Sequence, residues 1–469
     1  MSMRAGFRFA ASVASMTTTL MMLILAVASS STAAAGDGAE ASLDDYPAGY
    51  RHLIEDAYVP EQLDQEIFDN LWQAWNEPER SKAEQATPAE RRQMTLSHYG
   101  LMEAPGREGG VPLQYATTEN GGWAANCFLC HGGKVAGKVI PGLPNTHIAL
   151  ASLFADVTKT KDLLDRDVEN VERSLAFIPL GGSNGTTNAI IFGVLLANYR
   201  DADLNVVMDR PPPKMVHNDH DAPPWWHFKR KEFLYADGFA GKGHRALMQF
   251  MLTPSNGPEV FHEAEADFQE IYAWLETIEP PKYPYEIDDN LAQRGEIVFN
   301  QTCADCHGTY GENGQWPGEI VPLDVVGTDR ARLDSLTPEM RASYEVGWFS
   351  NYGEKKSIHD PGGYVAQPLD GIWASAPYLH NGSVPTIYHL FYPDERPVVW
   401  KRTEDGYDRE KIGLEVQVFD ELPETVARGP ELRTYFDTRR FGKSATGHLF
   451  PDELTDDEKR AVMEYLKTL

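Results

Sequence analysis

The spacing of apolar residues predicts a chain made mainly of helices and long loops, with little strand. Apolar side chains recur at the spacing of one helix face in four stretches. These stretches are residues 61–75, 268–278, 290–299 and 454–466. Thr455 and the acidic residues 456–458 are typical of a helix N-terminus, because a hydroxyl caps free amides and negative charge opposes the helix dipole.

A proline-rich segment, Glu279–Tyr285, separates the second and third of these stretches. Its prolines end the preceding helix, because proline lacks the amide hydrogen that a helix needs. Glycine- and proline-rich connections follow at 308–322 and 360–368. They are long for simple linkers and predict loops that wrap around something bulky.

All four cysteines of the 469-residue chain fall in two copies of one motif, at 127–131 and 303–307. Both copies have the sequence Cys-x-x-Cys-His, the pattern of covalent c-type haem attachment. A zinc site would need further ligands at a compatible spacing, and a redox dithiol would not need the trailing histidine twice. The sequence therefore predicts two haem c groups. Their binding residues are Cys127, Cys130, His131, Cys303, Cys306 and His307.

The fold class expected from this pattern is mainly α, with two cytochrome c-like haem domains, long loops and an N-terminal signal peptide. The expected segments are a signal peptide at 1–35, a helical extension at 36–110 that packs on the first haem domain, and haem domains at 111–285 and 286–469.

The N-terminus predicts export. Arg4 and Arg8 precede an apolar stretch that is densest at 20–27, and Ala33–Ala35 forms a cleavage signature. The alternative, an uncleaved anchor, would need a longer apolar core to span a membrane. We therefore expect a periplasmic protein without a stable membrane anchor.

The formal net charge of −28 excludes nucleic acid as a natural partner. It is compatible with steering of a basic redox partner, such as a small cytochrome or a cupredoxin. Ordinary solubility is the favoured explanation of this charge, since no compact acidic block stands out.

The ligand on the second face of each haem decides its function, because a strong sixth ligand gives an electron carrier and an open face binds dioxygen or peroxide. Small cytochromes c usually carry this ligand in the loop before the last helix. Here that loop is 442–450, so His448 is the first candidate for the second haem. His380, in a proline-bounded turn at 376–385, is the alternative.

The first haem has no comparable candidate. Met208, Met215, His217 and His220 are available, but none directly precedes the closing helix of that domain. Two adjacent tryptophans, Trp225 and Trp226, follow a pair of prolines. Such residues could wall an iron pocket, relay electrons between haems or fill a domain interface.

These motifs resemble the di-haem cytochrome c peroxidase superfamily, especially its rubber-oxygenase-like branch. The resemblance spans most of residues 120–469. Its motifs are the two haem motifs, Pro-Pro-Trp-Trp at 223–226, residues 274–284, the Ala-Pro-Tyr-x-His-x-Gly core at 376–382, and Gly447–His448 before the last helix.

The resemblance implies a division of labour between the haems. His131 would anchor a haem that reacts with peroxide or dioxygen, and His307 with His448 would hold an electron relay. Trp226 would lie between the haems, with Trp225 beside it on the reactive face. A calcium ion between the domains is also implied, although no residue can be matched to it.

The leading hypothesis is therefore a periplasmic di-haem c-type oxidoreductase of the peroxidase or oxygenase type. A pure electron carrier with two six-coordinate haems is the alternative, and a redox sensor is a weaker third.

Overall fold

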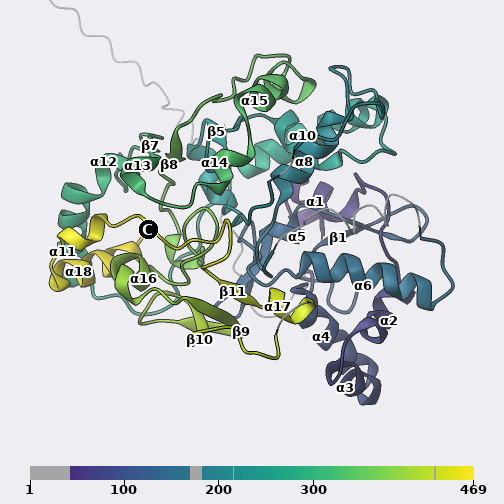
Figure 1. Cartoon of the computed structure of the whole chain (residues 1–469), viewed down its shortest axis with the longest axis horizontal. Coiled ribbons are helices and arrows are strands. Elements are labelled where there is room, and N and C mark those ends of the chain that lie inside the picture. The colour runs from purple at the N-terminus through teal and green to yellow at the C-terminus, as the bar shows by residue number, and fades with distance from the viewer. Residues whose placement is uncertain (1–42, 169–181, 215, 427–428) are drawn as a thin grey trace, which may run out of the picture. The chain divides into compact units, whose positions relative to one another are not determined.

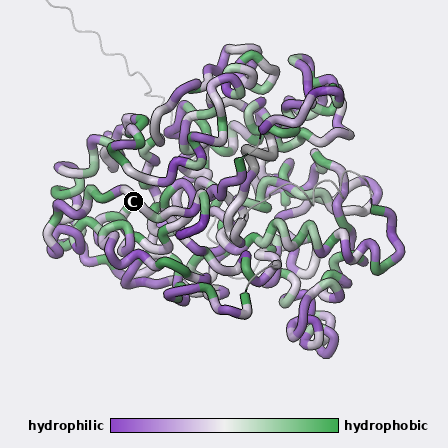
Figure 2. Tube along the Cα trace, viewed as in Figure 1, coloured by the Kyte–Doolittle hydropathy of each residue, from purple (hydrophilic) through white to green (hydrophobic). Residues whose placement is uncertain are grey.

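The computed structural model describes residues 43–168, 182–214, 216–426 and 429–469. From Ser42 onward the chain forms one compact unit in which helix predominates over strand, as the sequence predicts (Figure 1). The expected signal peptide and the candidate ligand Met215 lie outside the described residues. Among those residues no helix has both the length and the apolar character to cross a membrane. Hydrophobic and hydrophilic positions are interspersed along the trace (Figure 2).

The helices divide around the proline-rich segment. Those before it are α1 (Ala48–Glu55), α2 (Gln65–Asn70), α3 (Glu79–Gln85), α4 (Pro88–Tyr99), α5 (Phe128–His131), α6 (Leu150–Leu163), α8 (Ala189–Asn198), α9 (His244–Leu247) and α10 (Pro258–Leu275). Those after it are α11 (Asp289–Thr302), α12 (Ala304–His307), α13 (Leu323–Val326), α14 (Ala331–Ser335), α15 (Pro338–Glu345), α16 (Ile387–Phe391), α17 (Pro430–Arg433) and α18 (Asp456–Leu466). Short 3-10 helices include η2 (Leu71–Ala74), η3 (Trp225–Arg230) and η4 (Met248–Met251).

The predicted helices of the second half are confirmed. Asp288 caps α11, and Thr455 caps α18 in a reciprocal capping box with Glu458. The two helices lie side by side although they are far apart in sequence (Figure 1). Gly295 allows this close approach, because a Cβ there would collide with the Ala461 carbonyl. α11 thereby delivers the chain directly into the second haem motif.

Strands are short except for one hairpin that the apolar pattern did not predict. β9 (Val399–Asp408) pairs antiparallel with β10 (Gly413–Phe419) on one side and β11 (Tyr435–Asp437) on the other. The remaining strands form two-stranded antiparallel pairs. They are β1 (Tyr115–Thr117) with β2 (Trp123–Ala125), β3 (Gly132–Val135) with β4 (Lys138–Pro141), β5 (Phe233–Leu234) with β6 (Ala240–Gly241), and β7 (Ile320–Pro322) with β8 (Gly363–Val365).

Separate hydrophobic cores surround the two haem motifs. One core joins α1 and α10 to Phe128 of the first motif and to Trp225. Another joins α11 and α18 to Phe391 and also includes Trp226. The adjacent tryptophans of η3 therefore belong to different cores, and η3 connects the surroundings of one motif to those of the other.

Candidate haem sites

The first motif lies on α5, whose Phe128 is fully buried. Burial lowers the pKa of His131 to about 4, against an opposing effect of the Pro223 main chain. The imidazole is therefore neutral at pH 7, as a metal ligand must be. The Cys127 and Cys130 thiols line the same cavity as His131.

Trp225 packs beside His131, with ring centres 5.1 Å apart and planes 30° apart. Phe128 and Trp274 contact the other sides of Trp225, at 5.3 and 5.5 Å. Trp225 therefore contacts the His131 ring directly. Its place on the reactive face, which the resemblance implies, stays a prediction.

The second motif begins where α11 ends and continues into α12. The His307 Nδ1 lies 2.9 Å from the main-chain carbonyl oxygen of Gln367. This contact fixes the ring and leaves Nε2 for a metal, as is usual for metal-binding histidines. Burial lowers the pKa of His307, against the same hydrogen bond. Its imidazole is therefore also neutral at pH 7.

His448 is a ring neighbour of His307, with ring centres 6.1 Å apart and planes 61° apart. Two metal–nitrogen bonds of about 2 Å, with about 1 Å from each nitrogen to its ring centre, would separate an axial pair by roughly 6 Å. Burial, followed by the neighbouring His307, lowers the pKa of His448 to about 3. The pair therefore has the spacing and the protonation state of two ligands to one iron.

The loop that carries His448 is tightly held. Gly447 and His448 both have left-handed backbone conformations, and a Cβ at Gly447 would collide with the main chain of Gly327 and Thr328. The His448 amide donates to the Val326 carbonyl of α13 at 2.6 Å. Arg396 donates to the carbonyls of Ala445 and Gly447 at 2.6 and 2.8 Å. The position of His448 is therefore set by hydrogen bonds to its own amide and to the loop carbonyls just before it.

His380 has a different environment. Its ring stacks on Tyr364, with centres 4.1 Å apart and planes 20° apart. Burial, and then the nearby Arg332, lowers its pKa to about 3. His380 lines the cavity, but its described ring contact is with Tyr364, whereas the described ring contacts of His448 include His307.

A cavity of about 630 Å³ is lined by the cysteines and histidines of both motifs and by His448. Within the described chain, two arginines near it, the buried Arg332 and the half-buried Arg402, have guanidinium nitrogens without a hydrogen-bond partner. Burial lowers the pKa of Arg402 to about 10. Haem propionates are carboxylates, which such cations can pair with. The thiols, neutral imidazoles, cavity and buried cations all fit haem c.

The cavity beside the first motif is lined mainly by apolar side chains of α1, α9, η4 and α10. They are Leu53, Leu247, Phe250, Met251, Phe268, Ile271 and Leu275. Tyr58 and Thr253 are polar members of this wall. Phe250 is 43% exposed, so the wall reaches the surface of the protein there.

The candidates that the sequence offered as a sixth ligand of the first haem lie in different surroundings. Met208 is 64% exposed, and His217 Nδ1 lies 3.0 Å from the Asn188 side chain. His220 is buried and lines the cavity, and its Nε2 has no hydrogen-bond partner in the described chain. Burial lowers its pKa well below the usual value. His220 is thus the candidate of this group that the structure brings to the cavity.

Trp226 is completely buried and donates its indole N–H to the Asp370 carbonyl at 2.7 Å. Asp370 precedes Gly371, where a Cβ would lie 2.8 Å from the indole nitrogen. The close packing explains why a glycine with positive φ occupies this position. Trp226 is therefore fixed against the second half of the chain, whereas the adjacent Trp225 packs in the core around the first motif.

Part of the second half of the chain is similar to a known protein family. Residues 363–401 match a family model described as RoxA-like, cytochrome c-like. This segment contains Tyr364 and His380 and ends at the start of β9. A cytochrome c-like segment, in a chain that carries two Cys-x-x-Cys-His motifs elsewhere, indicates a haem c protein.

The chain is also similar to two uncharacterized proteins of Sinorhizobium fredii (strain NBRC 101917 / NGR234). Protein y4iM is 32% identical over 202 residues, which cover 37% of this chain and 44% of the relative. Protein y4iJ is 31% identical over 258 residues, which cover 41% of each chain. The similarity therefore spans less than half of either relative.

Sequence reasoning did not find the residues that orient the two sites. Gln367 acts through its main chain, and every residue offers a main-chain carbonyl of that kind. Arg396 and Arg402 are distant in sequence from the motifs, and only the tertiary fold brings them near the cavity.

Proposed function

We propose that this chain is an exported, periplasmic di-haem c-type oxidoreductase. The observation that carries the proposal is the unequal surroundings of the two motifs. His307 has a second histidine at the axial spacing, whereas the cavity beside His131 has mainly apolar walls. A haem with two histidines transfers electrons, and one with an open face reacts with small oxidants.

In this proposal Cys303, Cys306, His307 and His448 hold haem 2, and Cys127, Cys130 and His131 hold haem 1. When bound, haem c supplies an iron that exchanges electrons and can bind peroxide or dioxygen. The chain fixes the His307 ring through Gln367 and holds His448 through Arg396 and Val326. The apolar wall beside haem 1 excludes water and would accommodate an apolar substrate.

Trp226 and Trp225 are proposed to carry electrons from haem 2 towards haem 1. Trp226 lies in the core around the second motif, and Trp225 contacts His131. Electrons would come from a small redox protein, for which the acidic chain provides an attractive surface.

His220 supports the second candidate function, a pure electron carrier. It is a buried neutral imidazole in the cavity with a free Nε2. If it bound the iron of haem 1, both haems would be six-coordinate and neither would react with small oxidants.

Carbon monoxide and peroxide distinguish the two functions. We expect the reduced holoprotein to bind one carbon monoxide for every two haems, and peroxide to oxidise haem 1 while haem 2 supplies electrons. A His220→Ala variant should behave in the same way. Wild-type protein that binds no carbon monoxide, with binding appearing only in His220→Ala, would establish the electron carrier instead.

Two further measurements test the remaining parts of the proposal. Replacing Cys127 and Cys130 by serine, or Cys303 and Cys306, should leave one covalent haem in each case, measured by intact mass. N-terminal sequencing of the exported protein should begin at Gly36 if the expected signal peptide is removed.

A further inference from the structure

A tyrosine in the wall of the first haem site has a carboxylate partner. Tyr58 follows α1 and lines the cavity with Cys127. Its hydroxyl donates to Asp267 Oδ2 of α10 at 3.1 Å, and its ring packs edge-on against Phe268 at 4.9 Å. The phenol is therefore near the haem attachment point and has a fixed acceptor for its proton.

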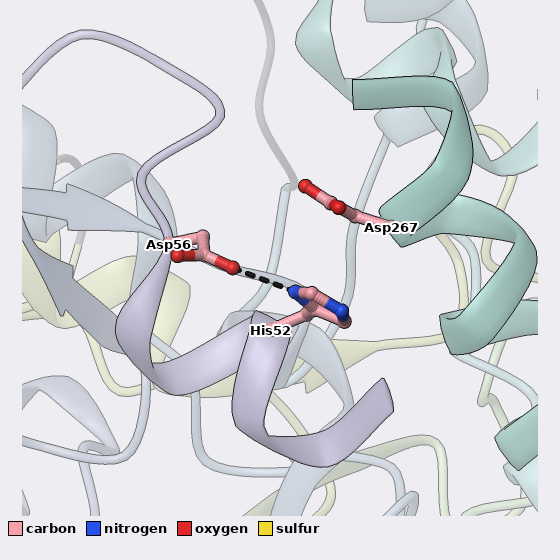
Figure 3. A group of neighbouring side chains, drawn as sticks. All are labelled: His52, Asp56 and Asp267. Carbon is pink, nitrogen blue, oxygen red and sulfur yellow. Dashed lines mark hydrogen bonds and ion pairs between the residues drawn. The ribbon is translucent and has the colours of Figure 1, made fainter. Parts of the chain in front are cut away.

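Asp267 belongs to a group of ionisable side chains between α1 and α10. Asp267, His52 and Asp56 each offer a polar atom within 4.8 Å of the others, and Figure 3 shows the His52–Asp56 contact with Asp267 facing it from α10. The two His52 ring nitrogens lie 2.7 Å from Asp56 Oδ2 and 3.2 Å from Glu270 Oε2. This arrangement links Asp267 to half-exposed and exposed groups that can take up or release a proton.

The electrostatics of this group keep Tyr58 protonated at rest. Burial, then the negative charges of Asp267 and Asp56, raises the pKa of Tyr58 far above its usual value. Burial would lower the pKa of His52, but the hydrogen bonds that its ring donates to Asp56 and Glu270, together with the charge of Asp267, raise it. A phenol of this kind releases its proton only when it also loses an electron, and an adjacent carboxylate then accepts it.

We propose that Tyr58 is a redox-active residue that accepts an oxidising equivalent from haem 1, with Asp267 as its proton acceptor. The inference rests on the proposed function of haem 1. In this step Tyr58 gives one electron to the haem centre that peroxide has oxidised. The phenol O–H bond breaks, and the proton passes to the Asp267 carboxylate. A neutral tyrosyl radical remains. Reduction of peroxide to two molecules of water takes two electrons and two protons, so Tyr58 supplies one of these electrons and haem 2 supplies the other, while the remaining protons come from solvent.

Freeze-quenched electron paramagnetic resonance of the holoprotein after peroxide tests this step. We expect an organic-radical signal that narrows when the protein contains ring-deuterated tyrosine. The signal should disappear in Tyr58→Phe, which removes only the hydroxyl. It should persist in Tyr50→Phe, the matched control, because Tyr50 is a buried tyrosine that packs against Phe128 of the same motif.

Asp267→Asn tests the role of the carboxylate. An amide keeps the size of the group but cannot take up the proton, so the radical should form roughly a hundredfold more slowly. The resting haem spectrum and the melting temperature should match those of the wild type. An unchanged rate of radical formation in this variant would overturn the assignment of Asp267.

The haem absorbance of the same samples separates failure of this inference from failure of the proposed function. If peroxide oxidises haem 1 but no tyrosyl signal appears, or the signal survives in Tyr58→Phe, Tyr58 is not the acceptor and the proposed function stands. If peroxide leaves the haem absorbance unchanged, both proposals are contradicted.

Discussion

The two Cys-x-x-Cys-His motifs are chemically alike, but their surroundings differ. At the second motif, the ring centres of His448 and His307 are 6.1 Å apart. Arg396 and the Val326 carbonyl hold the loop that carries His448. At the first, Trp225 packs against His131 and the cavity wall is mainly apolar. The motif determines which cofactor is attached, and the surrounding residues determine what its iron can do.

The difference also has a structural origin. His448 depends on a loop with two consecutive left-handed residues that rests on α13. The wall near the first motif consists of helix faces, which present side chains such as Ile271 and Leu275. At the second site, a loop held through its main chain can bring a ligand to the iron. At the first site, the packed helices leave room beside the iron.

Replacing His448 is expected to have the largest effect on this contrast. In His448→Ala, haem 2 should lose its low-spin signal entirely and bind carbon monoxide when reduced, because its second ligand is gone. His380→Ala is the control and should keep the low-spin signal. The reverse result, loss of the signal in His380→Ala alone, would assign the ligand to His380.

The next effect concerns a buried ion triad that joins the two halves of the chain. Asp237 is fully buried and pairs with Arg332 at 2.8 Å and also with Arg341. Asp237→Asn leaves two buried cations without their counter-charge, so we expect a loss of roughly 3–5 kcal/mol in unfolding free energy. Denaturant unfolding, followed at both haems, measures it.

The matched control is Asp334→Asn, which breaks an exposed pair with Arg330 at 2.7 Å. Its expected cost is below about 1 kcal/mol. An equal loss of stability in Asp237→Asn and Asp334→Asn would contradict the role of the triad in joining the two halves.

A smaller effect on stability should accompany a specific kinetic defect in Trp226→Phe. The variant loses the N–H donor to Asp370, which costs about 1 kcal/mol. Electron transfer from haem 2 to haem 1, followed by stopped-flow absorbance, should slow. Trp400→Phe removes another fully buried indole, bonded to the Ser383 carbonyl at 3.3 Å, and should leave this rate unchanged. Equal rates in both variants would exclude Trp226 from the route.

The smallest effect at neutral pH is expected for His227, beside Trp226. Burial, then the charge of Lys231, lowers its pKa to about 3 in the folded protein. The unfolded value is about 6.5. The neutral ring therefore contributes its full stability above about pH 6.5, and this contribution is lost as the pH falls towards 3. His227→Gln should lose less stability on acidification, by roughly 1 kcal/mol per pH unit below 6.5.

Urea unfolding between about pH 7 and pH 5 measures this difference between His227→Gln and the wild type. Identical slopes of unfolding free energy against pH would show that His227 is already protonated in the folded protein.

The sequence was sufficient to predict the helices whose apolar periodicity is strong. α11 and α18 lie where the pattern predicted them, because each buries one continuous face against the other. The β9–β10 hairpin escaped prediction, since β9 is rich in charged residues and only the first residue of β10 is buried. Its pairing depends on contacts across the chain that no local pattern records.

The sequence also predicted part of the two candidate sites. The cysteines and the adjacent histidines follow from the motif, and the place of His448 before the last helix made it the first candidate. The contact of Trp225 with His131 could not be deduced, because it depends on how η3 packs against Phe128 and Trp274. Tyr58 and Asp267 are 209 residues apart, so only the fold brings them together.

The inequality of the two haems is the central claim, and low-temperature electron paramagnetic resonance of the resting ferric holoprotein tests it most directly. We predict one low-spin signal from a haem with two histidine ligands and one high-spin signal from haem 1. The low-spin signal should be the one that His448→Ala removes. Two low-spin haems in the wild-type protein, in both the resting and the half-reduced state, would contradict the account.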